Sequence, residues 1–210
     1  IIAPASTNNG ELVVNGWSPS KRNNPHANSG IVVNIEKDDW KEFEKHGPLA
    51  AMYFQSSIEQ QAFKKGGGNF RAPAQRMTDF VNNKVSATLP VCSYVPGITS
   101  AAVADVFPDL LARTLRRAFQ EFGKKMKGYY TSEALIVATE SRTSSPVRIP
   151  RDPDSLAHPQ LKNLFPCGEG AGYAGGIMSA AMDGERVAAQ IARIFSPKPT
   201  SSCQCLKYLT

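Results

Sequence analysis

The chain has 210 residues, 41% of them hydrophobic, and a formal net charge of +6. This length allows one large domain or two small ones with a sizeable buried core. The sequence contains no run of about 18 apolar residues, which excludes a membrane-spanning helix. No nucleic-acid-binding motif accompanies the positive charge. We interpret the charge as a solvated basic helix face, with binding of an anionic ligand or partner as the alternative.

The first ten residues, IIAPASTNNG, contain neither a basic region nor a long apolar run, so they do not form a secretory signal. They also lack an initiating Met, and we therefore expect a fragment or a processed chain. The four cysteines show no paired C-x-x-C spacing, and the three histidines supply no second cluster of ligands. We predict no metal site and a reducing compartment.

The N-terminal third alternates between β-branched runs and polar stretches. Residues 11–15 (ELVVN) and 31–36 (IVVNIE) predict two strands joined by a long loop. Asp38 and Asp39 are expected to cap a short helix that continues through Phe43. The sequence therefore predicts a strand, a long loop and a second strand before the first helix.

The middle of the chain favours helices. Residues 48–65 have a helical pattern that the glycines of GGGN at 66–69 end. A second, short helix is expected to start at Pro73. The clearest helix covers about 108–127, where apolar residues recur at helical spacing opposite a basic face.

The C-terminal third returns to strand and helix signals. The apolar runs at 133–140 (EALIVATE) and 162–167 (KNLFPC) predict short buried strands. A final helix follows the glycines and ends near Phe195. Residues 196–210 are expected to form a flexible tail. Strands at both ends around a mainly helical block of 37–128 indicate a helical insertion in an α/β or α+β fold.

The glycine-rich stretch CGEGAGYAGG contains the letters of G-x-G-x-x-G from Gly170 to Gly175. A dinucleotide-binding fingerprint requires a preceding strand, a following helix, and a second strand that ends in an acidic residue. The predicted elements meet the first two conditions, but no second strand follows. The stretch is therefore not a complete adenosine-binding fingerprint.

A strand–glycine–helix turn still has a distinct chemistry. Its glycines expose backbone N–H groups, and the helix N-terminus adds a partial positive charge, which suits a phosphate or the electron-rich edge of a flavin. Glu169 is placed to accept hydrogen bonds from sugar or ribityl hydroxyls. The alternative is that the glycines only permit tight packing between strand and helix.

Three segments in order resemble the FAD-dependent dehydrogenases that are often called NAD(FAD)-utilising dehydrogenases and occur in bacteria and plastids. They are GELVVNGWSPSKRNNPHANSGIVVNI, GGGNFRAPAQRMTDF, and ESRTSSPVRI followed by LFPCGEGAGYAGGIMSAAMDGERVA. The resemblance extends over most of residues 5–195. It implies FAD as the cofactor and an unidentified small-molecule substrate, with NAD(P)H as a candidate electron donor.

The family's adenosine-binding fingerprint lies upstream and has no counterpart here. The resemblance therefore implies that the chain is the C-terminal portion of a two-domain, Rossmann-like FAD/NAD(P)-binding flavoprotein. Residues 1–36 would belong to the body shared by the FAD and substrate domains, and 37–128 would form the helical insertion on the substrate side. Residues 129–195 would return to the FAD-binding domain. The N-terminal remainder of the same protein, or a partner chain, would complete the site.

The resemblance also implies roles for individual residues. Gly168 and Glu169 would lie along the ribityl–phosphate chain, and Gly175, Gly176 and Ile177 would lie at the pyrimidine edge of the flavin. The other expected contacts to the flavin or the substrate pocket come from the same turn and from the polar loop after residue 140: Gly170, Gly172, Tyr173, Thr143, Ser144 and Ser145. For Tyr173 and the loop, packing and ordinary turn hydrogen bonds are the alternatives.

Arg142 is the residue that we expect to orient an anionic substrate. The resulting hypothesis is an FAD-dependent oxidoreductase represented by its C-terminal part. The alternative is a non-catalytic structural or docking subunit of a larger assembly that has lost cofactor binding. The family resemblance implies either bacterial cytoplasm or plastids as the location.

Overall fold

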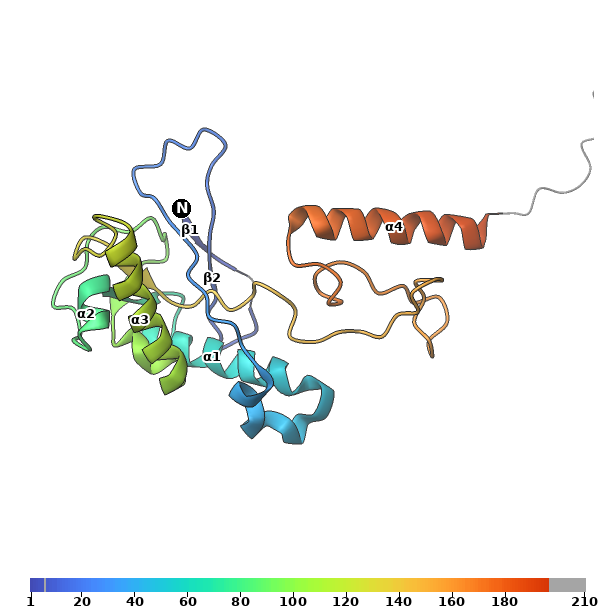
Figure 1. Ribbon diagram of the computed structural model, residues 1–210, viewed down its shortest axis with the longest axis horizontal. Coiled ribbons are helices and arrows are strands. Elements are labelled where there is room, and N and C mark those ends of the chain that lie inside the picture. Colours follow the sequence, from blue (N-terminus) through green and yellow to red (C-terminus); the bar gives the residue numbers. More distant parts are fainter. Residues whose placement is uncertain (6, 197–210) are drawn as a thin grey trace, which may run out of the picture. The chain divides into compact units, whose positions relative to one another are not determined.

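The structure is a computed structural model that describes residues 1–5 and 7–196 (Figure 1). It is a mixed α/β fold with small sheets and, in these residues, four α-helices. The chain divides into two compact units, Ile1–Arg142 and Thr143–Thr210. Almost all of the expected flexible tail, with Cys203 and Cys205, lies outside the described residues.

The first unit contains two small sheets, three α-helices and two 3-10 segments within its described part. The strands are β1 (Ile2–Pro4), β2 (Val14–Gly16), β3 (Ala72–Arg76), β4 (Ile98–Ser100) and β5 (Leu135–Val137). The helical elements are η1 (Lys37–Leu49), α1 (Ala50–Gly66), α2 (Met77–Val81), η2 (Val103–Val106) and α3 (Asp109–Lys125).

The three-stranded sheet has β3 at its centre. β4 pairs with it in parallel, with Ala72 opposite Ile98, and β5 pairs antiparallel, with Ala74 opposite Val137. The first four residues of β3 are buried, and small alanines there let α1 and the neighbouring strands approach closely. The other sheet is the antiparallel pair of β1 and β2.

Helix α1 buries one face formed by Phe54, Ile58 and Ala62, which recur every four residues. It ends at Gly67, whose φ of +110° is a left-handed conformation that favours glycine. Gly66 has no room for a side chain, because a Cβ there would lie 1.9 Å from the carbonyl oxygen of Arg71. The glycines therefore stop the helix and seat it against the segment that leads into β3.

A single apolar core joins these elements. Phe80 of α2 is fully buried and makes an edge-to-face contact with Phe119 of α3 at a centroid distance of 5.9 Å. Leu111 anchors the start of α3 in the same core; Arg113 and Arg117 are exposed, while Arg116 is half-buried and lies over the ring of Phe80. The amphipathic pattern of 108–127 thus correctly predicted both the helix and its buried face.

The prediction of a strand at 31–36 is wrong. No strand forms there; Ile31 and Val33 pack against the core through half-buried side chains, while Val32 is 58% exposed. The second predicted helix also begins later than expected, at Met77, because Ala72–Arg76 form the central strand. Proline is unusual in a central strand because it lacks an N–H, which is why Pro73 favoured a helix start.

The second unit contains one described helix, α4 (Ile177–Phe195), preceded by turns. The expected strand at 162–167 is absent, which corrects the prediction. Asn163 has a φ of +59° and the N–H of His158 donates to the carbonyl of Leu164, so the backbone bonds of this segment close turns. The turn before α4 is consequently a loop–glycine–helix turn.

Helix α4 has apolar residues on more than one side. Only Val187 is buried, and the large side chains of Ile177, Met178 and Met182 are 89%, 72% and 67% exposed. In the described part of the chain, no helix combines the length and the hydropathy needed to span a bilayer.

Candidate functional site

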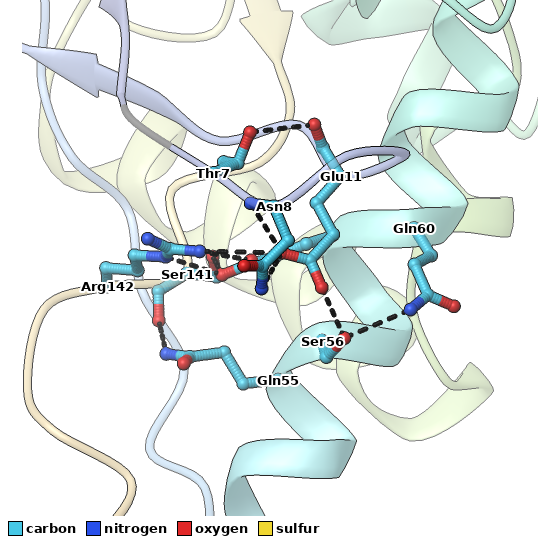
Figure 2. A network of polar contacts seen from close by, with 9 residues as sticks. Thr7, Asn8, Glu11, Gln55, Ser56, Gln60, Ser141 and Arg142 are labelled. Atoms are coloured by element: carbon cyan, nitrogen blue, oxygen red, sulfur yellow. Dashed lines mark hydrogen bonds and ion pairs between the residues drawn. The ribbon is translucent and has the colours of Figure 1, made fainter.

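A buried polar cluster lies in the first unit (Figure 2). We call it the Glu59 cluster, formed by Glu11, Ser56, Glu59, Ser141 and Arg142. The side chain of Glu59 is only 2% exposed. Arg142 donates to both of its carboxylate oxygens, from Nε to Oε1 at 2.9 Å and from Nη2 to Oε2 at 2.7 Å. This two-pronged geometry is the strong form of an arginine–carboxylate pair.

Glu11 supplies a second buried carboxylate, 4% exposed and 3.7 Å from Nη2 of Arg142. Ser56 donates to its Oε1 at 2.5 Å, and Asn8 donates to its Oε2 through the backbone and the side-chain amide. Burial raises the pKa of Glu11, but these hydrogen bonds and the charge of Arg142 together hold that pKa below its ordinary value. Both carboxylates thus accept hydrogen bonds within the cluster.

The cluster also fixes the last residues of the first unit. The hydroxyl of Ser141 donates to Oε1 of Glu59 at 2.7 Å, and Gln55 donates to the carbonyl of Ser141 at 2.8 Å. The hydrogen bond to Glu59 raises the pKa of Arg142. Arg142, expected to orient a substrate, therefore holds α1 and the end of this unit together.

The glycine turn, residues 168–176, lies in the second unit. Gly168 and Gly172 have φ values of +72° and +83°, a region that favours glycine. The N–H of Tyr173 donates to the carbonyl of Gly168 at 3.0 Å. A Cβ on Gly172 would lie 2.7 Å from the carbonyl oxygen of Val147. Backbone conformation therefore explains Gly168, and conformation together with close packing explains Gly172.

The loop before the turn runs along it. Ser145 Oγ lies 2.8 Å from the carbonyl oxygen of Val147 and 3.2 Å from that of Gly170, so its single O–H is shared between them, and the N–H of Ile149 donates to the carbonyl of Ala171 at 3.1 Å. A Cβ on Gly175 would lie 3.8 Å from Ser144 Oγ. The structure thus brings together two predicted site segments, the Ser144–Ser145 loop and the glycine turn. Arg142 belongs to the other unit and Thr143 is exposed.

The remaining glycines are not crowded. A Cβ on Gly170 would meet nothing within 4 Å, and on Gly176 its nearest neighbour would be Ser179 Oγ at 3.9 Å. No side chain caps the N-terminus of α4 at Gly176, and Glu169 and Ile177 are exposed. The space beside Gly170 and Gly176 leaves room for a group that approaches the backbone closely, while Ser179 Oγ accepts from the N–H of Gly175 at 3.3 Å and donates to the carbonyl of Gly176 at 2.9 Å.

An ion pair that the sequence reasoning missed supports the turn. Arg151 and Asp183 form two hydrogen bonds of 2.9 and 3.0 Å, with side chains 6% and 10% exposed. The N–H of Gly168 donates to the same carboxylate at 2.9 Å. The hydrogen bond from Arg151 lowers the pKa of Asp183. The available signal was an aspartate within the apolar and small residues of α4.

Both the hydroxyl and the ring of Tyr173 make contacts within the second unit. Its hydroxyl donates to the carbonyl of Ile149 at 2.9 Å. The guanidinium groups of Arg148 and Arg151 lie over its ring, 4.5 and 3.6 Å from the centroid. The ring thus packs against two arginines. Across residues 1–5 and 7–196, no group of three or more His, Cys, Asp or Glu side chains is placed to hold a metal ion.

Two comparisons with known proteins bear on these sites. A family model described as FAD-dependent protein, C-terminal domain-like, matches residues 1–143. A protein of Clostridium beijerinckii named as an uncharacterized protein is 40% identical over 197 residues, which are 93% of this chain. The chain spans 36% of the length of that relative.

Proposed function

The chain belongs to the family of FAD-dependent proteins that share this C-terminal domain, and on this premise we propose that it forms the C-terminal part of an FAD-dependent oxidoreductase. In this proposal the whole protein is a Rossmann-like FAD/NAD(P)-binding flavoprotein, and the chain contacts the flavin end of FAD. When bound, FAD supplies hydride chemistry, and the protein supplies binding, orientation and electrostatics.

The observation that supports this proposal is the packing of the Ser144–Ser145 loop along the glycine turn. Two segments separated by more than twenty residues lie side by side, and a Cβ on Gly170, Gly175 or Gly176 would meet nothing closer than 3.8 Å. Packing within the unit does not require glycine at these three positions. Close approach of a planar, polar ligand to the backbone would require glycine there.

Within this site, the residues have distinct proposed roles. Gly168 and Glu169 face the ribityl–phosphate chain, and Gly175, Gly176 and Ile177 lie at the pyrimidine edge. The N-terminus of α4 favours negative charge at that edge, because its first N–H groups lack intrahelical acceptors. Ser144, Ser145, Gly170 and Gly172 complete the turn, with Thr143 and Tyr173 beside it.

The exposed apolar side chains of α4 support the proposal that this chain is part of a larger protein. Ile177, Met178 and Met182 are exposed in the described structure, and exposed apolar patches on a folded domain mark interaction surfaces. We assign residues 129–195 to the FAD-binding domain, which the rest of a longer protein would complete; residues 129–142 of this assignment lie in the first unit, where β5 pairs with β3. The relative's much greater length supports this assignment.

The substrate side is assigned to the mainly helical block of 37–128, next to the body at 1–36. The substrate is an unidentified small molecule, and NAD(P)H is a candidate electron donor. Orientation of an anionic substrate by Arg142 stays a prediction, and it requires the guanidinium to serve a ligand while it pairs with Glu59.

The test is flavin binding by the full-length protein. We expect purified full-length protein to carry flavin, seen by its visible absorbance, and we expect the 210-residue chain alone to retain little FAD. Glu169→Ala should weaken FAD binding by removing an acceptor for hydroxyls, whereas Glu185→Ala, an exposed acid on α4, should not. Native full-length protein without flavin would contradict the proposed function.

A further inference from the structure

Arg148 is an exposed arginine whose backbone is packed against the glycine turn. A Cβ on Gly172 would lie 3.0 Å from Cα and 3.2 Å from Cβ of Arg148, so the absence of a side chain at Gly172 lets the two segments meet. The guanidinium of Arg148 then lies over the ring of Tyr173, 4.5 Å from its centroid. Both ends of this side chain are therefore positioned by the turn.

The charge of Arg148 is not matched by a neighbouring anion. Arg151, over the same ring, is paired with Asp183. Asp152 lines the same open depression as Arg148, but its carboxylate accepts hydrogen bonds from Ser155 and Asp154. Among the residues that the structure describes, no carboxylate lies within ion-pair distance of Arg148. The turn thus carries a positioned positive charge without a counter-charge.

A guanidinium that lies over an aromatic ring, with no carboxylate beside it, keeps N–H groups available for acceptors. Those donors match the paired oxygens of a phosphate better than a single point charge does. Arg148 contacts the middle of the turn, at Gly172 and Tyr173. The phosphates are the part of FAD that carries negative charge, so they are the part that a guanidinium at this position would bind.

We propose that Arg148 binds a phosphate group of the flavin cofactor. This inference rests on the proposed function, because it takes FAD as the ligand of the turn. It adds a residue that the family resemblance did not single out, and it separates recognition of the phosphate from recognition of the isoalloxazine ring. Tyr173 acts as the residue that positions Arg148.

The test compares FAD with riboflavin, which lacks the phosphates, on the full-length protein. Arg148→Ala should weaken FAD binding about tenfold to hundredfold, the range for losing hydrogen bonds to a charged group. Riboflavin affinity should stay unchanged. Inorganic pyrophosphate should compete with FAD for the apo form of the native protein and lose most of that competition in the variant. Arg193→Ala, an exposed arginine of α4, is the matched control and should change neither affinity.

Arg148→Lys should keep part of the FAD affinity, because it retains the charge without the paired donors, and Arg148→Gln provides a second variant if alanine disturbs folding. An equal loss for FAD and riboflavin, or an unchanged FAD affinity, would overturn the role of Arg148 while leaving the proposed function standing. Native full-length protein that binds neither flavin would overturn both.

Discussion

The Glu59 cluster and the glycine turn differ in whether their charged groups are paired within the protein. In the cluster, two buried carboxylates, a guanidinium and two hydroxyls satisfy one another. In the turn, a Cβ on Gly170, Gly175 or Gly176 would meet nothing closer than 3.8 Å, and Arg148 carries a charge without a described counter-ion. The first region uses its polarity to hold the fold, and the second leaves polarity for a ligand.

This difference teaches how to separate structural from binding residues without knowing the substrate. A substitution in a self-satisfied cluster should first reduce stability, because it leaves a buried partner unpaired. A substitution at an open position should first reduce ligand affinity. Across the described residues, no buried side-chain nitrogen or oxygen atom lacks a hydrogen-bond partner, so the open polarity of the turn lies at its surface.

The largest effect is expected for Glu59→Ala. It leaves Arg142 without its main partner and should lower the free energy of unfolding by about 3 kcal/mol, the low end for breaking a buried pair because Arg142 is partly exposed. Urea denaturation measures the change. The control is Glu133→Ala, whose side chain is 80% exposed and 3.7 Å from Arg76; equal losses in both variants would refute the structural role of the cluster.

A smaller loss, about 2 kcal/mol, is expected for Gly172→Ala. The new Cβ would lie 2.7 Å from the carbonyl oxygen of Val147, and the alanine would have to adopt the left-handed φ of +83°. Hydrogen exchange at the N–H of Ile149, which donates to Ala171, reports whether the loop still lies along the turn. Unchanged protection of that N–H would show that Gly172 does not seat the loop.

Acid should loosen the support of the turn. Because the pKa of Asp183 is lower in the folded state, its contribution is fully present above the unfolded value of about 3.9 and is lost as pH falls through the folded pKa. Asp183→Asn should therefore cost about 1.5 kcal/mol at neutral pH, and the difference from the native protein should shrink toward pH 3. A difference that is constant across this range would argue against the ion pair.

The smallest effect on stability is expected for Gly170→Ala, within about 0.5 kcal/mol, because a Cβ there meets nothing within 4 Å. The same change should weaken FAD binding by the full-length protein, since it fills space beside the exposed backbone. Thermal unfolding and FAD titration of one preparation separate the two quantities. Lost stability together with unchanged affinity would reverse the comparison between the two regions.

The sequence predicted the elements whose signals are local. Periodic apolar residues and terminal glycines correctly located α1, α3 and α4, and the apolar run at 133–140 contains β5. The runs at 31–36 and 162–167 were misleading, because an apolar segment does not specify whether a partner strand exists. β1 escaped prediction for the same reason, since its pairing with β2 is a tertiary property.

The candidate sites divide in the same way. The glycine turn was visible as a sequence pattern, but its contact with Ser144 and Ser145 depends on a long-range packing that no local pattern encodes. Glu59 looked like a surface residue among the glutamines of α1, and its partner Arg142 lies 83 residues away. Its position three residues before the buried Ala62, at the edge of the apolar face, was the one signal that pointed inward.

The closure of the first unit at Arg142 has a consequence for how this protein can evolve. Ser141 and Arg142 are tied back to Glu59 immediately before the second unit begins, and the family model ends at residue 143. A chain lengthened or recombined after this point exposes no buried charge of the first unit. At that boundary the first unit can be inherited as an intact module while the sequence that follows it changes.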